Sequence, residues 1–174
     1  MPPSPPPSRA ALLNAAKAFT SAFASNAPPS EIRTHFTSQD DRILVFEHGL
    51  PQLAPFLGRA FRGADGLAQY LGIVSECLSF EDMRFGGDGD GDGDGDGDGD
   101  GDGDGDGDGG GYVVDAEART VAVRGAARFT WRSTGQSWDE MFVYVLAFDG
   151  ECKVERYEIW ADSGAAWLAS RGEL

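Results

Sequence analysis

The chain has 174 residues and a formal net charge of −15. Eleven of its 29 acidic residues lie in one Gly-Asp tract, residues 86–111, and the other 18 acidic residues against 14 basic ones leave a charge of −4. This mildly acidic remainder of about 150 residues fits one domain and gives no electrostatic attraction to nucleic acid or to an anionic membrane.

Cysteine content and the first residues of the chain indicate the cellular compartment of the protein. Cys77 and Cys152 are too few for a disulfide framework, and the proline- and serine-rich start contains no secretory apolar segment. No apolar run reaches the roughly 20 residues of a membrane span. We therefore expect a cytoplasmic protein, with one domain at residues 9–172 after a disordered proline-rich segment at residues 1–8.

The first half of the chain predicts helices and weak strands. Ser8 is a helix N-cap, and residues 9–24 place apolar side chains at helical spacing. Residues 31–37 predict a shorter helix, and residues 43–47 a short strand beside which residues 56–61 can return. A second long amphipathic helix begins at Gly63, and residues 80–85 predict another strand.

Three consecutive strands dominate the second half: residues 120–133, 137–149 and 153–162, joined by turns at Thr134-Gly135 and Asp149-Gly150. Residues 112–115 predict a strand before them, and residues 163–171 predict a helical turn or two after them. Helices followed by a run of strands predict an α+β fold, with about three helices packed on one face of a curved antiparallel sheet.

The register of this meander predicts an aromatic inner face. A two-residue turn at Thr134-Gly135 places Trp131 opposite Trp138 and Phe129 opposite Glu140. The same face then carries one carboxylate among aromatic side chains: Phe129, Trp131, Trp138, Glu140, Phe142 and Tyr144.

The second turn leaves two registers open for the last strand. A three-residue loop turns Glu158 inward and places Asp162 opposite Glu140, which brings carboxylates together. A two-residue loop turns Tyr157 and Ile159 inward instead.

The Gly-Asp tract predicts a disordered, expanded loop, because it has maximal backbone entropy, no apolar side chain and closely spaced like charges. Its repeated Asp-x-Asp-x-Asp-Gly pattern matches the start of a calcium-binding EF-hand loop, but glycine stands where that loop needs its bidentate glutamate. We interpret the tract as a simple-repeat expansion in a hairpin loop; weak, diffuse cation binding is the alternative.

Several features together resemble the SnoaL-like branch of the nuclear-transport-factor-2-like superfamily, which includes ketosteroid isomerases and polyketide cyclases. They are the helix start Phe61-Arg62-Gly63 with Tyr70-Leu71, the strand pair at residues 126–130 and 139–148, and the closing pattern Asp149-Gly150-x-x-Lys153-Val154…Trp160-x-Asp162. The resemblance covers about Arg9 to Ala169, without the tract.

This resemblance implies a cone-shaped half-barrel with a hydrophobic pocket between helices and concave sheet, and dimerisation through the convex face. Its members include cyclases, isomerases, dehydratases and epoxide hydrolases, alongside non-enzymatic binding and scaffold proteins. The dehydratases use pocket histidines where this chain has Phe, Trp or Ala, which argues against their mechanism.

Candidate catalytic residues follow from charge and position. Glu140, among aromatic side chains, is the best candidate for an acid-base group. The alternative is that Glu140 has no catalytic role and lies at an open end of the sheet or forms an ion pair with an arginine. Glu158 and Asp162 are candidates beside it, although Asp162 can instead cap the next helix. His48 can reach the pocket mouth as a base, or lie exposed in its loop.

Two functions remain open, and with them whether the protein is an enzyme. One is acid-base catalysis by a lyase, isomerase or cyclase on a small apolar molecule with a carbonyl; the other is non-catalytic ligand binding or a dimeric scaffold. Two histidines and no paired cysteines predict no metal, and no other cofactor is expected. Two partners are expected, the small molecule and a second copy of the chain. The second copy binds to the convex face. The small molecule binds to six aromatic residues: Phe129, Trp131, Trp138, Phe142, Tyr144 and Trp160.

Overall fold

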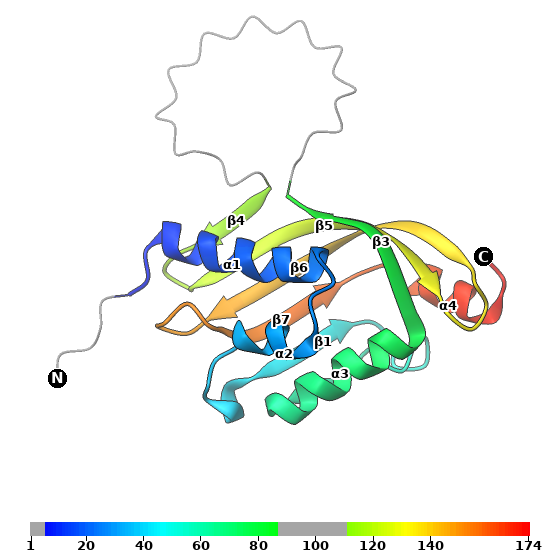
Figure 1. The fold of residues 1–174 in the computed structure, drawn as a ribbon, viewed down its shortest axis with the longest axis horizontal. Helices are drawn as coiled ribbons and strands as arrows, with labels where there is room; N and C mark the ends of the chain where they lie inside the picture. Colours follow the sequence, from blue (N-terminus) through cyan, green and yellow to red (C-terminus); the bar gives the residue numbers. More distant parts are fainter. Residues whose placement is uncertain (1–5, 87–110) are drawn as a thin grey trace, which may run out of the picture.

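A computed structural model of the protein describes residues 6–86 and 111–174. The expectations for residues 1–5 of the proline-rich segment and for residues 87–110 of the Gly-Asp tract lie outside this part of the chain. Within it, a curved sheet arches over helices, as Figure 1 shows. The predicted α+β fold class is confirmed.

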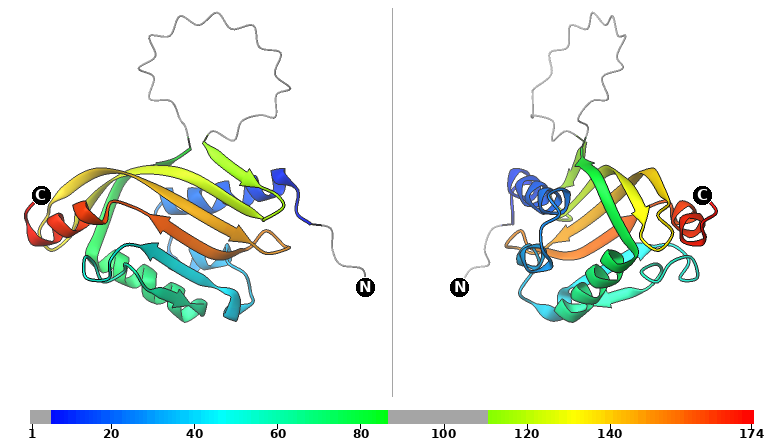
Figure 2. Two further views of the ribbon diagram at one scale, coloured as in Figure 1. Left: turned by 180° about the vertical axis from the view of Figure 1, so that it is seen from behind. Right: turned by 45° about the vertical axis from the view of Figure 1, so that its right-hand side comes forward.

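Helices lie along the concave face of the sheet, and one more follows its last strand (Figure 2). The helices are α1 (Arg9–Ala24), α2 (Pro29–Thr34), α3 (Gly63–Cys77) and α4 (Ser163–Arg171), with a short 3-10 helix η1 (Asp40–Arg42). Two caps match the sequence prediction. The side chain of Ser8 accepts a hydrogen bond from the N–H of Ala11, and that of Asp162 accepts from the N–H groups of Gly164 and Ala165.

The strands are β1 (Leu44–His48), β2 (Ala60–Arg62), β3 (Leu78–Phe85), β4 (Tyr112–Asp115), β5 (Thr120–Trp131), β6 (Ser137–Phe148) and β7 (Val154–Trp160). Their order across the sheet is β2-β1-β7-β6-β5-β3, and β4 also pairs with β5. The sheet does not close into a barrel. All described pairs are antiparallel except β1 and β7, which run parallel, so the predicted antiparallel sheet is mixed at this pairing.

The central hairpin has a register that differs from the prediction by two residues. The N–H of Trp131 donates to the carbonyl of Gln136, so the turn between β5 and β6 holds four residues rather than two. Glu140 therefore lies opposite Ala127 instead of Phe129. Because a shift of two keeps every side chain on its own face, the predicted inner face survives this correction.

The last strand combines parts of both predicted registers. The loop before β7 has three residues, since the N–H of Asp149 donates to the carbonyl of Lys153. The pairing of β6 with β7 then shifts at Ala147 and Phe148, which leaves Glu155 as an extra residue, a β-bulge. Beyond the bulge the side chains have changed face, and the Tyr157 and Ile159 side chains are buried in the core.

Strands β3 and β4 lie end to end along the same edge of β5. Phe85 of β3 pairs with Gly125, and Tyr112 of β4 pairs with Val123, so only the position opposite Arg124 separates them. Both strands run antiparallel to β5 and therefore form one edge strand in two pieces. The prediction of a hairpin at the tract is wrong, because the strands on either side of it, β3 and β4, pair with β5 and not with each other.

The hydrophobic core fills the space between the helices and the concave face. Phe19 of α1 is fully buried, and its ring contacts those of Phe36 and Tyr157. Close packing also explains Gly125 in β5: a Cβ atom there would lie 2.4 Å from the ring of Phe142. In the described part of the chain, no helix is long and apolar enough to cross a membrane.

Candidate functional site

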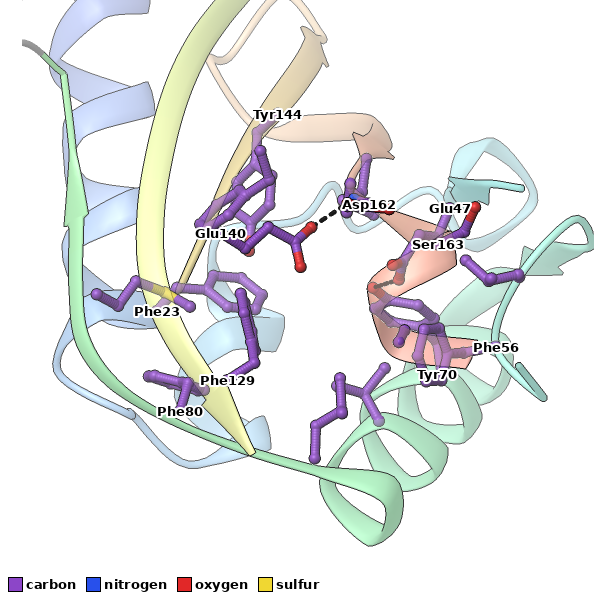
Figure 3. A pocket seen from close by; sticks show the side chains of 18 of the residues that line it. Phe23, Glu47, Phe56, Tyr70, Phe80, Phe129, Glu140, Tyr144, Asp162 and Ser163 are labelled. Carbon is purple, nitrogen blue, oxygen red and sulfur yellow. Dashed lines mark hydrogen bonds between the residues drawn. The ribbon is translucent and has the colours of Figure 1, made fainter. Parts of the chain in front are cut away.

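A mostly apolar cavity of about 90 Å³ lies between the concave face of the sheet, α3 and the start of α4 (Figure 3). It contains four of the six aromatic residues predicted for binding, together with three carboxyl side chains. These are Phe129, Trp138, Phe142 and Tyr144, and Glu47, Glu140 and Asp162. The cavity therefore brings together four of the predicted aromatic residues and two of the predicted acidic ones, Glu140 and Asp162.

Glu140 projects from β6 into this cavity and is only 8% exposed. One of its carboxylate oxygens accepts a hydrogen bond from the indole N–H of Trp138, and the other accepts from the backbone N–H of Asp162. Burial raises the pKa of Glu140, while these two hydrogen bonds oppose that rise. Within residues 6–86 and 111–174, Glu140 forms no ion pair with an arginine, which was the alternative from sequence.

Asp162 also borders the cavity, but its carboxylate has a structural partner. One oxygen accepts the N–H groups of Gly164 and Ala165 and so caps α4. Together with the bond from its own N–H to Glu140, this ties the end of β7 and the start of α4 to β6. Glu140 and Asp162 thus fix the cavity wall where β6, the end of β7 and the start of α4 meet.

Glu47 is the cavity carboxyl that the sequence analysis missed. It lies on β1, is 7% exposed, and accepts a hydrogen bond of 2.6 Å from the hydroxyl of Tyr70 on α3. Burial raises the pKa of Glu47 to about 7; the bond from Tyr70 lowers it, and the charge of Glu140 raises it further. A carboxyl with such a pKa changes its protonation state near neutral pH.

Strand alternation in β1 is the signal that identifies Glu47. Val45 is buried in the core, and Glu47, two residues on, faces the same side, whereas Phe46 and His48 face the other. His48 was predicted from this strand for its chemistry, whereas the same alternation places its neighbour Glu47 inside.

Three tyrosine hydroxyls are further polar groups around the cavity. The side chains of Tyr144 and Tyr157 hydrogen-bond to each other, with ring centroids 4.8 Å apart, and Tyr70 bonds to Glu47. Burial raises the pKa of all three phenols well above the usual value. At neutral pH they are therefore uncharged hydrogen-bond donors within an apolar wall.

Three predicted site residues lie on the convex face, away from the cavity. The rings of His48 and Trp160 stack with centroids 3.9 Å apart, and Nε2 of His48 is 3.1 Å from a carboxylate oxygen of Glu158. Glu158 also pairs with Arg156. Each of the three follows or precedes an inward-facing residue of β1 or β7, so alternation turns it outward.

Trp131, the sixth predicted aromatic residue, is buried but does not line the cavity. Its indole N–H donates to the hydroxyl of Ser133, and its ring lies 6.4 Å from that of Phe56. It packs the end of the hairpin beside the loop that follows β1. Its role in this structure is core packing.

The arrangement can perform proton transfer. A carboxyl with a pKa of about 7 can accept a proton from a carbon atom next to a carbonyl, and neutral phenols can donate hydrogen bonds to the oxyanion that then develops. Among the residues that the structure describes, no group of three or more His, Cys, Asp or Glu side chains could hold a metal ion.

Solved structures with the same architecture come from bacteria and fungi. An NTF2-like protein from Burkholderia xenovorans LB400 superposes with a TM-score of 0.62 at 18% identity, over 94% of this chain and 98% of that chain. The BvnE pinacolase of Penicillium brevicompactum gives 0.62 at 14% identity, over 95% of both chains. A ketosteroid isomerase-like protein from Erwinia carotovora atroseptica gives 0.54 at 20% identity, over 88% and 95%.

The chain therefore has the fold of the nuclear-transport-factor-2-like superfamily, as the sequence resemblance implied. No protein-family model matches the sequence, and no curated protein matches it. At these identities the superpositions establish the fold alone, and the chemistry depends on the residues of the cavity.

Proposed function

We propose that this domain is a SnoaL-like acid-base enzyme, an isomerase, lyase or cyclase that acts on a small apolar molecule with a carbonyl group. The observation that carries the proposal is Glu47, a buried carboxyl with a pKa of about 7 on the wall of an apolar cavity. A group whose pKa lies near the working pH can take up and return a proton efficiently.

Glu47 takes the role of general base that the sequence analysis assigned to Glu140. Both carboxylate oxygens of Glu140 already accept hydrogen bonds from N–H groups, so that side chain holds the cavity together. One oxygen of Glu47 accepts from Tyr70, and no other described residue donates to its second oxygen. This second oxygen accepts the substrate proton.

The tyrosine pair supplies stabilisation of the oxyanion. A bond between two hydroxyls uses only one of their two protons, so one proton of the Tyr144–Tyr157 pair is available to the carbonyl oxygen of the substrate. Removal of a proton from the neighbouring carbon moves negative charge onto this oxygen, where a buried neutral donor stabilises it. Return of the proton at another carbon completes an isomerisation.

Deuterium exchange of 2-tetralone, a small apolar ketone, tests the proposal without knowledge of the natural substrate. The wild-type protein is expected to accelerate exchange of the protons next to the carbonyl in heavy water, with a rate that rises as pH passes through about 7. Glu47→Gln keeps an oxygen that accepts from Tyr70 but cannot take a proton, and is expected to lower the rate about 100-fold or more.

Glu158→Gln is the matched control, because it makes the same chemical change on the convex face. It is expected to leave the exchange rate unchanged, and thermal melting of each variant shows that it is folded. Full activity in Glu47→Gln, or equal losses in both variants, would contradict the assignment of Glu47 as base.

Ligand binding without catalysis is the second candidate function, and the hydrogen bonds of Glu140 favour it. Glu140 is the carboxylate that the sequence predicts as the acid-base group, yet both of its oxygens accept hydrogen bonds from the protein itself. The same assay separates the two functions. Binding of 2-tetralone, seen as a change in tryptophan fluorescence, without faster exchange would support the binding function.

We also propose that the protein forms a homodimer through the convex face. Met141 is 64% exposed there, with Val143 and the 41% exposed Trp160 nearby across β6 and β7. Apolar side chains with charged neighbours such as Arg124 are typical of an interface with a polar rim. Light scattering is expected to show a dimer at micromolar concentration and a monomer for Met141→Asp; a monomeric wild type would contradict the proposal.

A further inference from the structure

A second cavity of about 200 Å³ adjoins the first. The two cavities share six wall residues: Phe23, Leu71, Val74, Leu78, Phe80 and Phe129. Figure 3 places Phe23, Phe80 and Phe129 on the side of the first cavity opposite Glu47 and Tyr70. The second cavity therefore borders the first at the end that is far from the proposed base, and these apolar rings line both spaces.

The walls of the two adjoining cavities differ in charge. The wall of the first cavity includes three carboxyl groups and no Lys, Arg or His. The wall of the second includes one charged residue, Arg132, together with the polar residues Asn26, Ser75 and Ser79 and no acidic residue. A molecule that occupies both cavities meets acidic groups at one end and a guanidinium at the other.

Arg132 is held in place by the backbone of α3. Its Nε–H donates to the carbonyls of Ser75, at 2.7 Å, and Leu78, at 3.0 Å, where this helix ends and β3 begins. Within the described residues no ion pair involves Arg132, and no hydrogen bond uses its two terminal nitrogens. Four of the five guanidinium N–H groups remain available in a fixed fork.

We propose that Arg132 binds the carboxylate of an amphipathic substrate whose apolar body extends past Phe23, Phe80 and Phe129 into the first cavity. A guanidinium fork matches a carboxylate with two parallel hydrogen bonds. The acidic groups of the first cavity repel the same carboxylate, so the charges at both ends select one orientation. This inference deepens the proposed function: the orientation brings the uncharged end of the substrate to Glu47.

Two octanoyl probes test this selectivity at pH 8 by the change in tryptophan fluorescence, since Trp138 lines the first cavity. Octanoate and octanamide share the apolar body and differ in charge. The wild-type protein is expected to bind octanoate at least about fivefold more tightly than octanamide, and the preference is expected to shrink from about 0.1 M to about 1 M salt, because Arg132 is exposed.

Variants of Arg132 separate ligand binding from support of α3. Arg132→Gln is expected to abolish the preference for octanoate with the affinity for octanamide unchanged, and Arg132→Lys to retain part of it. Arg84→Gln removes the same charge from an exposed position on β3 and is expected to keep the full preference. Thermal melting identifies any loss of fold.

Three results would overturn the proposal: equal affinity of the wild type for both probes, no binding of either probe, or an unchanged preference in Arg132→Gln. Loss of affinity for both probes together with a lower melting temperature in that variant would assign Arg132 to structural support only. These binding measurements do not depend on catalysis. Failure of the exchange assay alone would remove the acid-base function and leave the carboxylate site. Loss of the octanoate preference alone would remove the carboxylate site and leave the acid-base function.

Discussion

Protonation of Glu47 is coupled to folding, and Glu47→Gln measures the coupling. Burial raises the pKa of this carboxyl from 4.5 to about 7. The folded state therefore binds the proton more tightly than the unfolded state, and the contribution to stability is full below pH 4.5 and lost as pH rises through 7. A pKa difference of about 2.5 units corresponds to about 3.5 kcal/mol at about 1.4 kcal/mol per unit, of which about 3 kcal/mol is lost between pH 4.5 and 8.

Urea unfolding at a series of pH values between 4.5 and 8 provides the assay. Relative to Glu47→Gln, which carries no titrating group at this position, the wild-type free energy of unfolding is expected to fall by about 3 kcal/mol across the range. Glu117→Gln, at an exposed turn, is the control and should follow the wild type. Parallel pH profiles for the wild type and Glu47→Gln would refute a raised pKa at Glu47, and with it the proposed base.

Three further predictions concern the neighbours of Glu47 and the interrupted edge strand. Glu140→Gln is expected to lower the free energy of unfolding by about 1–3 kcal/mol, because its new amide N–H₂ must face one of two N–H donors; an unchanged urea midpoint would contradict this. Tyr70→Phe removes the bond that lowers the Glu47 pKa, so the exchange-rate profile of 2-tetralone should move to higher pH, and a shift to lower pH would argue against that bond. Deletion of residues 87–111 leaves Gly86 opposite Arg124 and joins β3 to β4 in one strand, so the melting temperature is expected to stay the same or rise; a fall of more than a few degrees would show that the tract supports the fold.

Local sequence pattern determined the elements of this protein and the faces of its central hairpin. Helical spacing of apolar residues marked α1 and α3, and alternation with turn residues marked β5 and β6. The turn length was predicted two residues too short, yet Phe129, Trp138, Glu140, Phe142 and Tyr144 still face inward. The error was harmless because side chains on a strand repeat their direction every two residues.

Tertiary structure decided which elements meet and therefore where the candidate site lies. The bulge at Glu155 turned Tyr157 inward and left Glu158 outside, although the loop length alone favoured the reverse. Parallel pairing of β1 with β7 brought Glu47 onto the cavity wall, and pairing of β3 and β4 with one edge of β5 made these two strands parts of one edge strand. Periodicity is a local property of the chain, whereas the partner of a strand and the place of a bulge depend on contacts between residues far apart in sequence.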